Sequence, residues 1–562
     1  MLKREFSKLA DGRFDLLVIG GGIGGLSIAW DAALRGLSVA VVEKGDFGSG
    51  ASQGCFKIVH GGLRYLQHAD FGRLRESVEE QRILRIIAPH LITPLPILVP
   101  CYGYGMQSPE VLRTGVAFYD LITGNRNRGV NPSAVLRPGK RLSAAQCIEE
   151  APHIQTNGLR GGVVFNDAQM SNCDRLTLAF ALSAASRGAQ LCNYAQVSGF
   201  EIEDGQISAV SVQDVLGGES AQVRARVVVN AAGVWSSAVK SLLPGLQAPT
   251  KVFSKGMQVV LPRTVMHYAL ALESRHADKT AYVARGGRSY FLVPWREATL
   301  VGTADIVHAD DPDACNFSEA EVKRFIAEVH AMYPAPQIDY KYARFVFGGL
   351  RPVAPEIQTK YQRGEKISDD EVGTAKRDII SAENAGVSNL LGVVGVKYTT
   401  CRAVAEAATD RVCKMLGRPL GCDTSRQLLV GADIGDKAEF EQKLLERHAD
   451  EYQPALLKQL ASNYGSLAED ILRLSGEIPP EQRRLSSTCS VLAAEIMYAV
   501  EQEMALTLED AVFRRTPLGT AGSPGSEALE RASEIAAEKL GWDHDERQRQ
   551  LRAVLQRFPL AA

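Results

Sequence analysis

The segment FDLLVIGGGIGGLSIAWDAALRGLSVAVVEKGD, residues 14–46, decides the fold of this chain. Its first six residues are apolar apart from one aspartate, and they predict a buried strand. Residues 23–34 show apolar positions at helical spacing, and residues 37–42 form a second apolar run that ends in Glu43. A strand, a glycine-rich turn, a helix and a second strand with a terminal acid form, in this order, the βαβ unit that binds a dinucleotide.

Each small residue of the turn has its own physical task. Gly20, Gly22 and Gly25 satisfy the spacing GxGxxG. The first makes the tight turn, the second admits the pyrophosphate, and the third lets the helix pack closely on the strand. The helix N-terminus offers unpaired amides to the phosphates, and Glu43 can accept hydrogen bonds from ribose hydroxyls. This motif alone does not distinguish NAD from FAD.

Composition excludes several other classes of protein. The chain has 562 residues and a formal net charge of -2, so no global basic field indicates a nucleic-acid partner. Its ten cysteines are scattered without a CxxC pair, which favours reduced thiols in the cytoplasm over a disulfide framework or a metal site.

The sequence also bears on membrane association. The N-terminal residues MLKREFSKLADGR lack an apolar signal core, and no apolar run approaches the roughly 18 residues of a spanning helix. We therefore expect a cytoplasmic protein that is not integral to a membrane. Attachment to the inner face of the cytoplasmic membrane stays open, and EVLRTGVAFYDLITGNRNR, residues 110–128, is either a headgroup-contacting segment or a buried helix.

Two later segments favour FAD. Residues 225–235, ARVVVNAAGVW, predict a buried strand that ends in a small-residue turn at Gly233, and this resembles the return strand of two-dinucleotide-fold flavoproteins. Residues 192–214 alternate like strands around an Asp-Gly turn, and they resemble the adenine-contacting segment of those proteins, with Val197 at the contact. No second GxGxxG opens a helix after a strand, so we expect electrons to leave to an external acceptor.

The motifs GGGIGG, HGGLRYL, VNAAGVW, PWREATLVGTAD, FGGLRP and VGVKYTT, in that order, resemble the FAD-dependent glycerol-3-phosphate dehydrogenases, which are D-amino-acid-oxidase-like flavoproteins. The resemblance runs from about residue 14 to 408 and resumes at AAEIMYAVEQEMALTLEDAVFRRTPLG, residues 493–519. It implies an α/β, Rossmann-like FAD fold with a β-sheet substrate domain and a C-terminal helical domain. It also implies oxidation of sn-glycerol 3-phosphate to dihydroxyacetone phosphate, usually on a membrane surface with quinone as acceptor.

The four letters GGLR occur twice, in HGGLRYLQ and in FGGLRPVA. The resemblance places Gly61 and Gly62 beside the isoalloxazine ring, with Arg64 and Tyr65 facing a small anionic substrate. It places Arg351 on the opposite wall. Arg377 matches a further cation for the phosphate, and several charge-assisted donors are needed to offset the desolvation of such an anion. The alternative for each arginine is a salt bridge, and for Tyr65 it is core packing.

The segment VVGVKYTTCRAVAEAATDRV, residues 393–412, predicts another strand, turn and helix. Gly395 lies in the turn, and Thr399 or Thr400 is the expected N-cap of a helix aimed at the flavin N1–C2=O edge. Lys397 matches the active-site lysine of the family, which binds the phosphate or the developing alkoxide. The alternative is a lysine that extends to solvent from a helix start.

One position departs from the family pattern. The dehydrogenases typically read KGxH, whereas this chain reads SKGMQVVL, with Gln258 in place of the candidate catalytic histidine. Glutamine can orient a hydroxyl but cannot take its proton at neutral pH. Another group is then the base, or the substrate differs, or the enzyme is slow. His60 is a candidate substitute for the base, but it also matches a family histidine that lies near the flavin and is not the base, so the sequence favours a structural role for it.

The expected FAD-binding domain is discontinuous, with residues 1–91, 158–252 and 349–416. Residues 92–157 form an insert, 253–348 the substrate domain and 423–562 a helical accessory domain. Three functions stay open: a glycerol-3-phosphate dehydrogenase, a related flavoenzyme acting on another anionic hydroxy or amino compound, and a flavin-binding scaffold or sensor. The electron acceptor, quinone or another, and a homodimer are further open points.

Overall fold

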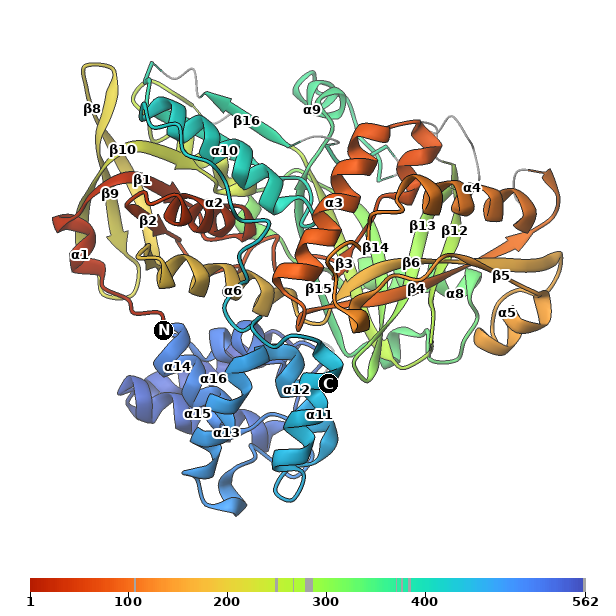
Figure 1. Cartoon of the computed structure of the whole chain (residues 1–562). Helices are drawn as coiled ribbons and strands as arrows, with labels where there is room; N and C mark the ends of the chain where they lie inside the picture. The colour runs from red at the N-terminus through yellow and green to blue at the C-terminus, as the bar shows by residue number, and fades with distance from the viewer. Residues whose placement is uncertain are drawn as a thin grey trace.

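Two β-sheets and a C-terminal group of helices make up the molecule (Figure 1). The computed structural model describes residues 1–105, 108–247, 251–265, 267–277, 287–369, 371–375, 378–382 and 386–558. Arg377, one of the three predicted phosphate ligands, lies outside the described residues.

The first sheet contains the βαβ unit. Its strands lie in the order β16 (Ile379–Ala382), β17 (Leu390–Val394), β10 (Ser220–Asn230), β1 (Arg13–Ile19), β2 (Val39–Val42) and β7 (Gln190–Cys192), and β9 (Gln206–Asp214) and β8 (Ala195–Glu203) continue from β10. Strands β17, β10, β1, β2 and β7 are parallel, as a dinucleotide-binding sheet requires. The expected Rossmann-like α/β fold is confirmed.

The parallel core of the first sheet is buried on both faces, which explains why β2, β17 and the C-terminal halves of β1 and β10 are largely apolar. Leu16 and Val18 of β1 pack in one core cluster with the helices α2 (Ile23–Leu34), α6 (Cys173–Ser186) and α10 (Cys401–Met415). Leu17 and Ile19 face the other way, into a cluster with β8, β9 and α1 (Phe6–Asp11). The alternation of side chains along one strand therefore builds both cores.

The second sheet is mostly antiparallel. Its strands lie in the order β15 (Phe345–Pro352), β11 (Phe253–Pro262), β14 (Ala298–His308), β13 (Gly287–Trp295), β12 (Ala269–Ala277), β4 (Ile92–Tyr102), β6 (Leu159–Met170) and β3 (Ile58–Val59), and β5 (Lys140–Leu142) pairs with β6. The boundary predicted at residue 158 comes just before β6, which pairs with β4 in this sheet and does not belong to the first sheet. Strands from the predicted insert and from the predicted substrate domain thus form one sheet.

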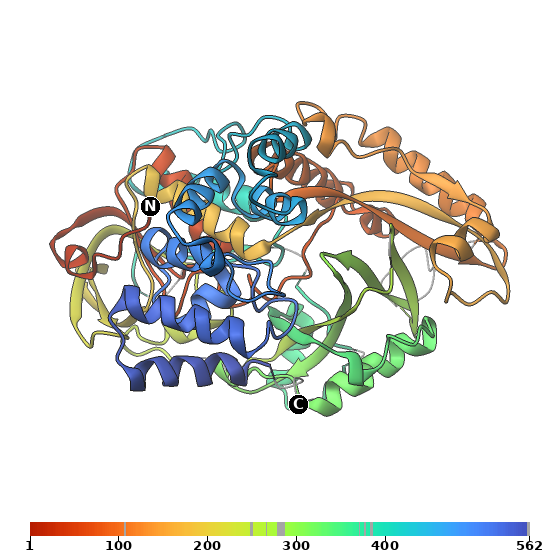
Figure 2. The same ribbon diagram turned by 90° about the horizontal axis from the view of Figure 1, so that it is seen from below.

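The remaining helices cover the second sheet or stand at the C-terminal end of the chain. Outside the C-terminal region they are α3 (Phe71–Ile87), α4 (Pro109–Ile122), α5 (Ala144–Glu150), α7 (Ser236–Lys240), α8 (Glu319–Met332) and α9 (Pro355–Gln362). The C-terminal helices are α11 (Lys437–His448), α12 (Pro454–Tyr464), α13 (Ala468–Gly476), α14 (Ala493–Glu503), the π-helix η9 (Asp510–Arg515), α15 (Ser526–Leu540) and α16 (His544–Gln556). In Figure 2 these blue helices lie in front of strands from both sheets.

The C-terminal helices are fixed to the second sheet by aromatic packing. The rings of Phe345, on β15, and Phe513, on η9, stack with their centroids 5.7 Å apart. Phe558 packs against both rings, at 5.8 Å from Phe345 and 5.3 Å from Phe513. Such aromatic pairs contribute beyond the area that they bury.

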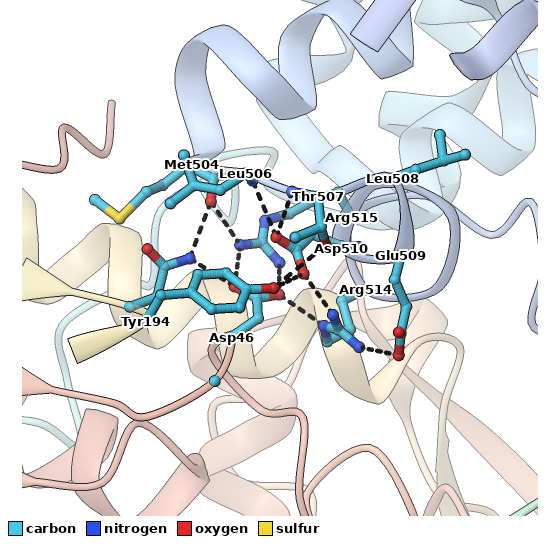
Figure 3. Close-up of polar contacts among 12 residues, drawn as sticks. Asp46, Tyr194, Met504, Leu506, Thr507, Leu508, Glu509, Asp510, Arg514 and Arg515 are labelled. Atoms are coloured by element: carbon cyan, nitrogen blue, oxygen red, sulfur yellow. Dashed lines mark hydrogen bonds and ion pairs between the residues drawn. The ribbon is translucent and has the colours of Figure 1, made fainter. Parts of the chain in front are cut away.

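A buried ionic network fixes the same helices to the loop after β2 of the first sheet (Figure 3). Asp46, which follows β2, accepts hydrogen bonds from Arg514 Nε and from Arg515 NH1, each at 2.7 Å. Arg514 NH2 also donates to Asp510 Oδ1 at 2.5 Å, and the Tyr194 hydroxyl donates to the same oxygen at 2.8 Å. Burial alone would raise the pKa of Asp46, but the two guanidinium groups hold it well below its usual range.

We expect Arg515→Met to lower the free energy of unfolding by about 3–5 kcal/mol, because it leaves a buried carboxylate short of a partner. Arg531→Met is the matched control, since Arg531 forms a half-exposed pair with Glu534 on α15, and such surface pairs contribute about 0–1 kcal/mol. Denaturant unfolding at neutral pH measures both. Equal losses in the two variants would contradict the role of the network.

The pH dependence has a defined sign. Because the pKa of Asp46 is lowered by folding, its stabilisation is fully present above the unfolded value of about 3.9. It is lost as the pH falls further, so the stability difference between the natural chain and Asp46→Asn should narrow below that pH.

Candidate active site

A cavity of about 1500 Å³ is lined by residues from both sheets. Its wall includes the turn after β1, the ends of β2, β10 and β17, and parts of β11, β14 and β15. In an open parallel sheet, ligands bind beyond the carboxyl ends of the strands, and the cavity occupies this position in the first sheet.

The turn after β1 has the geometry that a dinucleotide phosphate requires. Gly20 has a φ of 108°, and a Cβ there would lie 2.7 Å from the carbonyl oxygen of Ala231. A Cβ on Gly25 would lie 1.9 Å from the carbonyl oxygen of Gly20, so only glycine lets α2 pack at this distance. Gly22, the N-cap of α2, lines the cavity, and a Cβ on it would meet only Ser52 Oγ, at 3.3 Å.

Glu43 is held in place by the backbone at the end of β2. Its Oε2 accepts a hydrogen bond from Gly21 N at 2.7 Å, and its Oε1 accepts one from Gly45 N at 2.9 Å. Burial raises the pKa of this carboxyl group. Glu43, Val197 and Gly233 all line the cavity. The structure therefore gathers the predicted ribose and adenine contacts around one space.

The two GGLR segments position their arginines through different backbone conformations. In the first copy Gly62 has a φ of 80°, and Arg64 lies on the 3-10 helix η1 (Leu63–His68). In the second copy Arg351 lies on the extended strand β15, and a Cβ on Gly348 would come within 1.8 Å of the backbone of β11. The first glycine pair makes a turn, whereas the second permits close packing. Both arginines line the cavity.

Arg351 is oriented by residues of β11, the strand next to its own, and of β14, the strand beyond β11. Its NH2 group donates to Asp305 Oδ1, on β14, and to Ser254 Oγ, on β11, at 3.3 Å. Ser254 Oγ in turn donates to Asp305 Oδ1 at 2.7 Å. The Arg351 side chain is 34% exposed, and its Nε donates no hydrogen bond within the described residues. Part of the guanidinium group is thus left to serve an anionic ligand.

The first GGLR segment meets the segment VGVKYTT at Tyr65. Lys397 Nζ lies 4.9 Å from the Tyr65 ring centroid, and the Arg73 guanidinium carbon lies 4.7 Å from it. The His60 ring packs edge-on against the same ring, with centroids 6.2 Å apart. Burial and the charge of Lys397 lower the pKa of His60 to about 4. The imidazole is therefore neutral at neutral pH and can accept a proton.

Gln258 is 3% exposed, and its side chain joins three segments of the chain through its polar contacts. Its amide nitrogen donates to the carbonyl oxygens of Gly54, at 3.1 Å, and of Phe347, at 2.9 Å. Its amide oxygen then faces Thr303 Oγ1, 3.4 Å away. Both amide hydrogens are thus used by backbone carbonyls. Gln258 lines the cavity, but it holds the wall together and supplies no base.

The other predicted residues lie on the wall or just behind it. Gly395 and Thr399 line the cavity, and Thr400 occupies the N-cap position of α10. Gly61 lies behind the wall, where its amide donates to Asp167 Oδ1 at 2.5 Å and where a Cβ would lie 2.2 Å from the Tyr119 hydroxyl.

Sequence reasoning missed three residues: Asp305, Ser254 and Ser52. The Ser52 Oγ accepts a hydrogen bond from Ile23 N, at the start of α2, at 2.9 Å. Asp305 ends the motif PWREATLVGTAD, which was a signal that the position matters. Its pairing with Arg351 depends on the strand order β15, β11, β14, and neighbouring letters cannot reveal that order.

These features define a class of protein: a flavoprotein whose dinucleotide site opens into a cation-lined substrate cavity. The family model of FAD dependent oxidoreductases matches residues 15–411, and that of the C-terminal domain of alpha-glycerophosphate oxidase matches residues 422–547. The chain belongs to the FAD-dependent glycerol-3-phosphate dehydrogenase family.

Relatives match over nearly the whole chain. The glycerol-3-phosphate dehydrogenase of Synechocystis sp. is 31% identical over 98% of this chain and 97% of its own length. The human mitochondrial glycerol-3-phosphate dehydrogenase is 30% identical over 96% of this chain and 72% of its own length. The Bacillus halodurans glycerol-3-phosphate dehydrogenase complexed with FAD superposes with a TM-score of 0.76 at 24% identity, covering 99% of this chain and 96% of that one, and this likeness supports the fold.

The residues present fit FAD. Because Gly22 has no side chain, the backbone of the turn is open to the pyrophosphate, and a side chain at this position would narrow that space. Gly20, Gly22 and Glu43 would hold its pyrophosphate and ribose. None of the described helices is both long enough and apolar enough to cross a membrane. Within the described ranges, no group of three or more His, Cys, Asp or Glu side chains is placed to hold a metal ion.

We expect Gly25→Ala to abolish FAD retention, because the added methyl group would overlap the Gly20 carbonyl oxygen and displace the turn. Gly115→Ala on α4, away from the cavity, is the matched control: a Cβ there meets nothing within 4 Å, and alanine in a helix gains about 0.8–1 kcal/mol over glycine. The flavin absorbance of the two purified proteins measures the difference. A yellow Gly25→Ala protein would contradict this account of the turn.

Proposed function

We propose that this chain oxidises the secondary hydroxyl of sn-glycerol 3-phosphate to the ketone of dihydroxyacetone phosphate and that its electrons pass to an external acceptor. The observation that carries the proposal is Arg351, which Asp305 and Ser254 orient in the cavity that begins at the dinucleotide turn. When bound, FAD supplies the group that accepts a hydride from the substrate carbon.

The phosphate of the substrate would be held by cations from three segments. Arg351 comes from β15, Arg64 from η1 and Lys397 from the turn before α10, and all three line the cavity. A phosphate dianion loses much hydration when it is enclosed, and charge-assisted hydrogen bonds from several donors offset that loss. Three cations from separate elements also fix the orientation of the substrate, which a single cation would not.

The proton of the substrate hydroxyl requires a separate acceptor, and we assign it to His60. Gln258 has no basic atom, and its amide hydrogens are bound to carbonyl oxygens. His60 is the one histidine among the described residues that line the cavity, and with its pKa lowered to about 4 it is neutral at the pH of the cytoplasm. The lowered pKa makes His60 a weak base, but its neutral imidazole has a free electron pair that can take the proton as the hydride leaves the substrate.

The second candidate is a flavoenzyme of the same architecture that acts on another anionic hydroxy or amino compound. The observation in its favour is Gln258, which replaces the family histidine. Its amide group is hydrogen-bonded to two backbone carbonyl oxygens of the cavity wall, so the wall is built around glutamine at this position. A catalytically silent flavin scaffold is less well supported, because Arg351 is oriented by two dedicated partners and keeps donor capacity.

We propose a membrane surface as the place where the electrons leave, with quinone as acceptor. Helix α4 has one buried face, at Val116 and Tyr119, and one exposed face that is apolar. Figure 1 shows α4 on the side of the molecule away from the blue C-terminal helices. The large apolar side chains of the exposed face are Val111 (37% exposed), Phe118 (47%), Leu121 (78%) and Ile122 (38%). An apolar stripe on an exposed helix is typical of a segment that lies in the interface of a bilayer, and quinone is dissolved there.

The substrate assignment is tested by anaerobic reduction of the flavin. We expect sn-glycerol 3-phosphate to bleach the FAD-loaded protein. Arg351→Lys should lower kcat/KM about ten- to a hundredfold, because each lost charged hydrogen bond costs about 1.5–3 kcal/mol and lysine lacks the planar fork. His60→Asn should instead slow flavin reduction and leave the substrate dissociation constant nearly unchanged.

Arg363→Lys, an exposed change after α9, is the control for loss of an arginine. A panel of anionic C3 to C6 hydroxy and amino compounds belongs in the same experiment. Bleaching by another compound and none by glycerol 3-phosphate would establish the second candidate, and bleaching by none would favour the scaffold.

The membrane proposal is tested by sedimentation with vesicles of phosphatidylglycerol and phosphatidylcholine. We expect the double variant Phe118→Ser, Leu121→Ser to bind at least about tenfold more weakly, since each such side chain contributes about 1.5–3 kcal/mol when fully buried. Leu555→Ser, which changes a 47% exposed leucine on α16, is the control. Unchanged binding by the double variant would exclude α4 as the docking helix.

A further inference from the structure

Two cysteines meet at the wall of the cavity. Cys55 lies in the loop between β2 and β3, is half-buried and lines the cavity. Cys173 is the first residue of α6, is fully buried, and has its Sγ 3.6 Å from the carbonyl oxygen of Gln53. The side chains of the two cysteines interact with each other. One sulfur is therefore open to the cavity and the other is held directly behind it.

A buried cation lies beside this pair. Lys57 is 3% exposed, and its Nζ donates to Cys173 Sγ at 3.1 Å. The same ammonium group lies 4.4 Å from the ring centroid of Phe347 and 5.4 Å from that of Trp295. A charge enclosed in this way requires an anion close by.

The carboxyl group nearest to the pair does not meet that requirement. Asp174 is buried, and one of its oxygens, Oδ1, has no hydrogen-bond partner within the described residues. Burial and the neighbouring Cys173 raise its pKa well above the usual value, which favours the neutral carboxyl group. The described residues place no ion-paired carboxylate on Lys57, and its ammonium group donates instead to a cysteine sulfur.

Of the two thiols, Cys55 is the one that loses its proton more readily. The hydrogen bond from Cys173 lowers the pKa of Cys55 and Lys57 adds to this effect, whereas the pKa of Cys173 is raised well above its usual value. Cys55 is also the member of the pair that faces the cavity. An accessible thiolate with a second thiol next to it is the arrangement of redox-sensing cysteines.

We propose that Cys55 reacts with hydrogen peroxide entering the cavity and that Cys173 resolves the product into a disulfide. The Cys55 thiolate attacks one peroxide oxygen, the O–O bond breaks, and the leaving hydroxide takes a proton to become water. The Cys173 thiol then attacks the sulfenic acid sulfur, the S–O bond breaks, and a second water leaves. Two thiols are oxidised by two electrons in total, and one peroxide is reduced to two waters.

The disulfide would fasten the loop before β3 to α6. This loop includes Gly54, whose carbonyl oxygen receives the amide of Gln258, and Ser52, which accepts a hydrogen bond from the first amide of α2. Oxidation therefore acts on the wall that both the dinucleotide turn and the substrate cavity share. It is independent of which hydroxy compound the enzyme oxidises.

The test uses the FAD-loaded protein, treated with hydrogen peroxide and mapped by peptide mass spectrometry. We expect a peptide cross-link between Cys55 and Cys173 that dithiothreitol removes. In Cys173→Ser, dimedone should label Cys55 as the sulfenic acid, and in Cys55→Ser no cross-link should form. Cys422→Ser is the matched control: Cys422 is also half-buried, but its pKa is raised, and the cross-link should be unaffected.

Lys57→Met examines the origin of the reactivity. Removing the cation should slow oxidation of Cys55 about tenfold, because the thiolate fraction falls as the thiol pKa rises towards its ordinary value. If Lys57→Met loses its flavin and unfolds, the pH dependence of alkylation of the natural chain replaces it, with a midpoint expected below about 8.5. Absence of the 55–173 cross-link, or oxidation of Cys55 no faster than of Cys422, would overturn the proposal.

Discussion

The carboxylate of Asp46 is the contact on which the arrangement of the molecule depends. It lies three residues beyond Glu43, at the end of the segment that shapes the dinucleotide site, and it receives both Arg514 and Arg515 from the C-terminal region. Two charged groups of one sign and one of the other are stable in the interior only when each hydrogen bond is made. The loop after β2 and the C-terminal helices are therefore held in one fixed relation, although 468 residues separate Asp46 from Arg514.

A second constraint is the close approach of backbones around the loop that carries Cys55. A Cβ on Gly54 would lie 2.0 Å from the carbonyl oxygen of Gly348, and the amide of Gln258 joins the same two segments from the side. The loop thus has the flavin-binding turn on one side and the substrate sheet on the other. A change on either side is transmitted to the other by packing, because so little free volume separates them.

The two GGLR segments of the cavity have the same sequence but different local structures. Arg64 extends from a 3-10 helix after a left-handed glycine, whereas Arg351 extends from a strand and is aligned by Asp305 and Ser254. Only the second is held by partners within its own sheet. Arg64 is also the more exposed of the two arginines.

The sequence by itself determined the βαβ unit, the parallel sheet and the class of cofactor, because the glycines, the apolar runs and Glu43 act within about 30 residues of one another. It also marked both GGLR arginines and Lys397 as residues of one site. The tertiary structure alone decided the rest: that β4 and β6 join the substrate sheet, that Gln258 joins three segments of the chain, that Asp305 aligns Arg351, and that Cys55 meets Cys173. These contacts join residues far apart in the chain, and they follow from strand order and close packing, which no local pattern specifies.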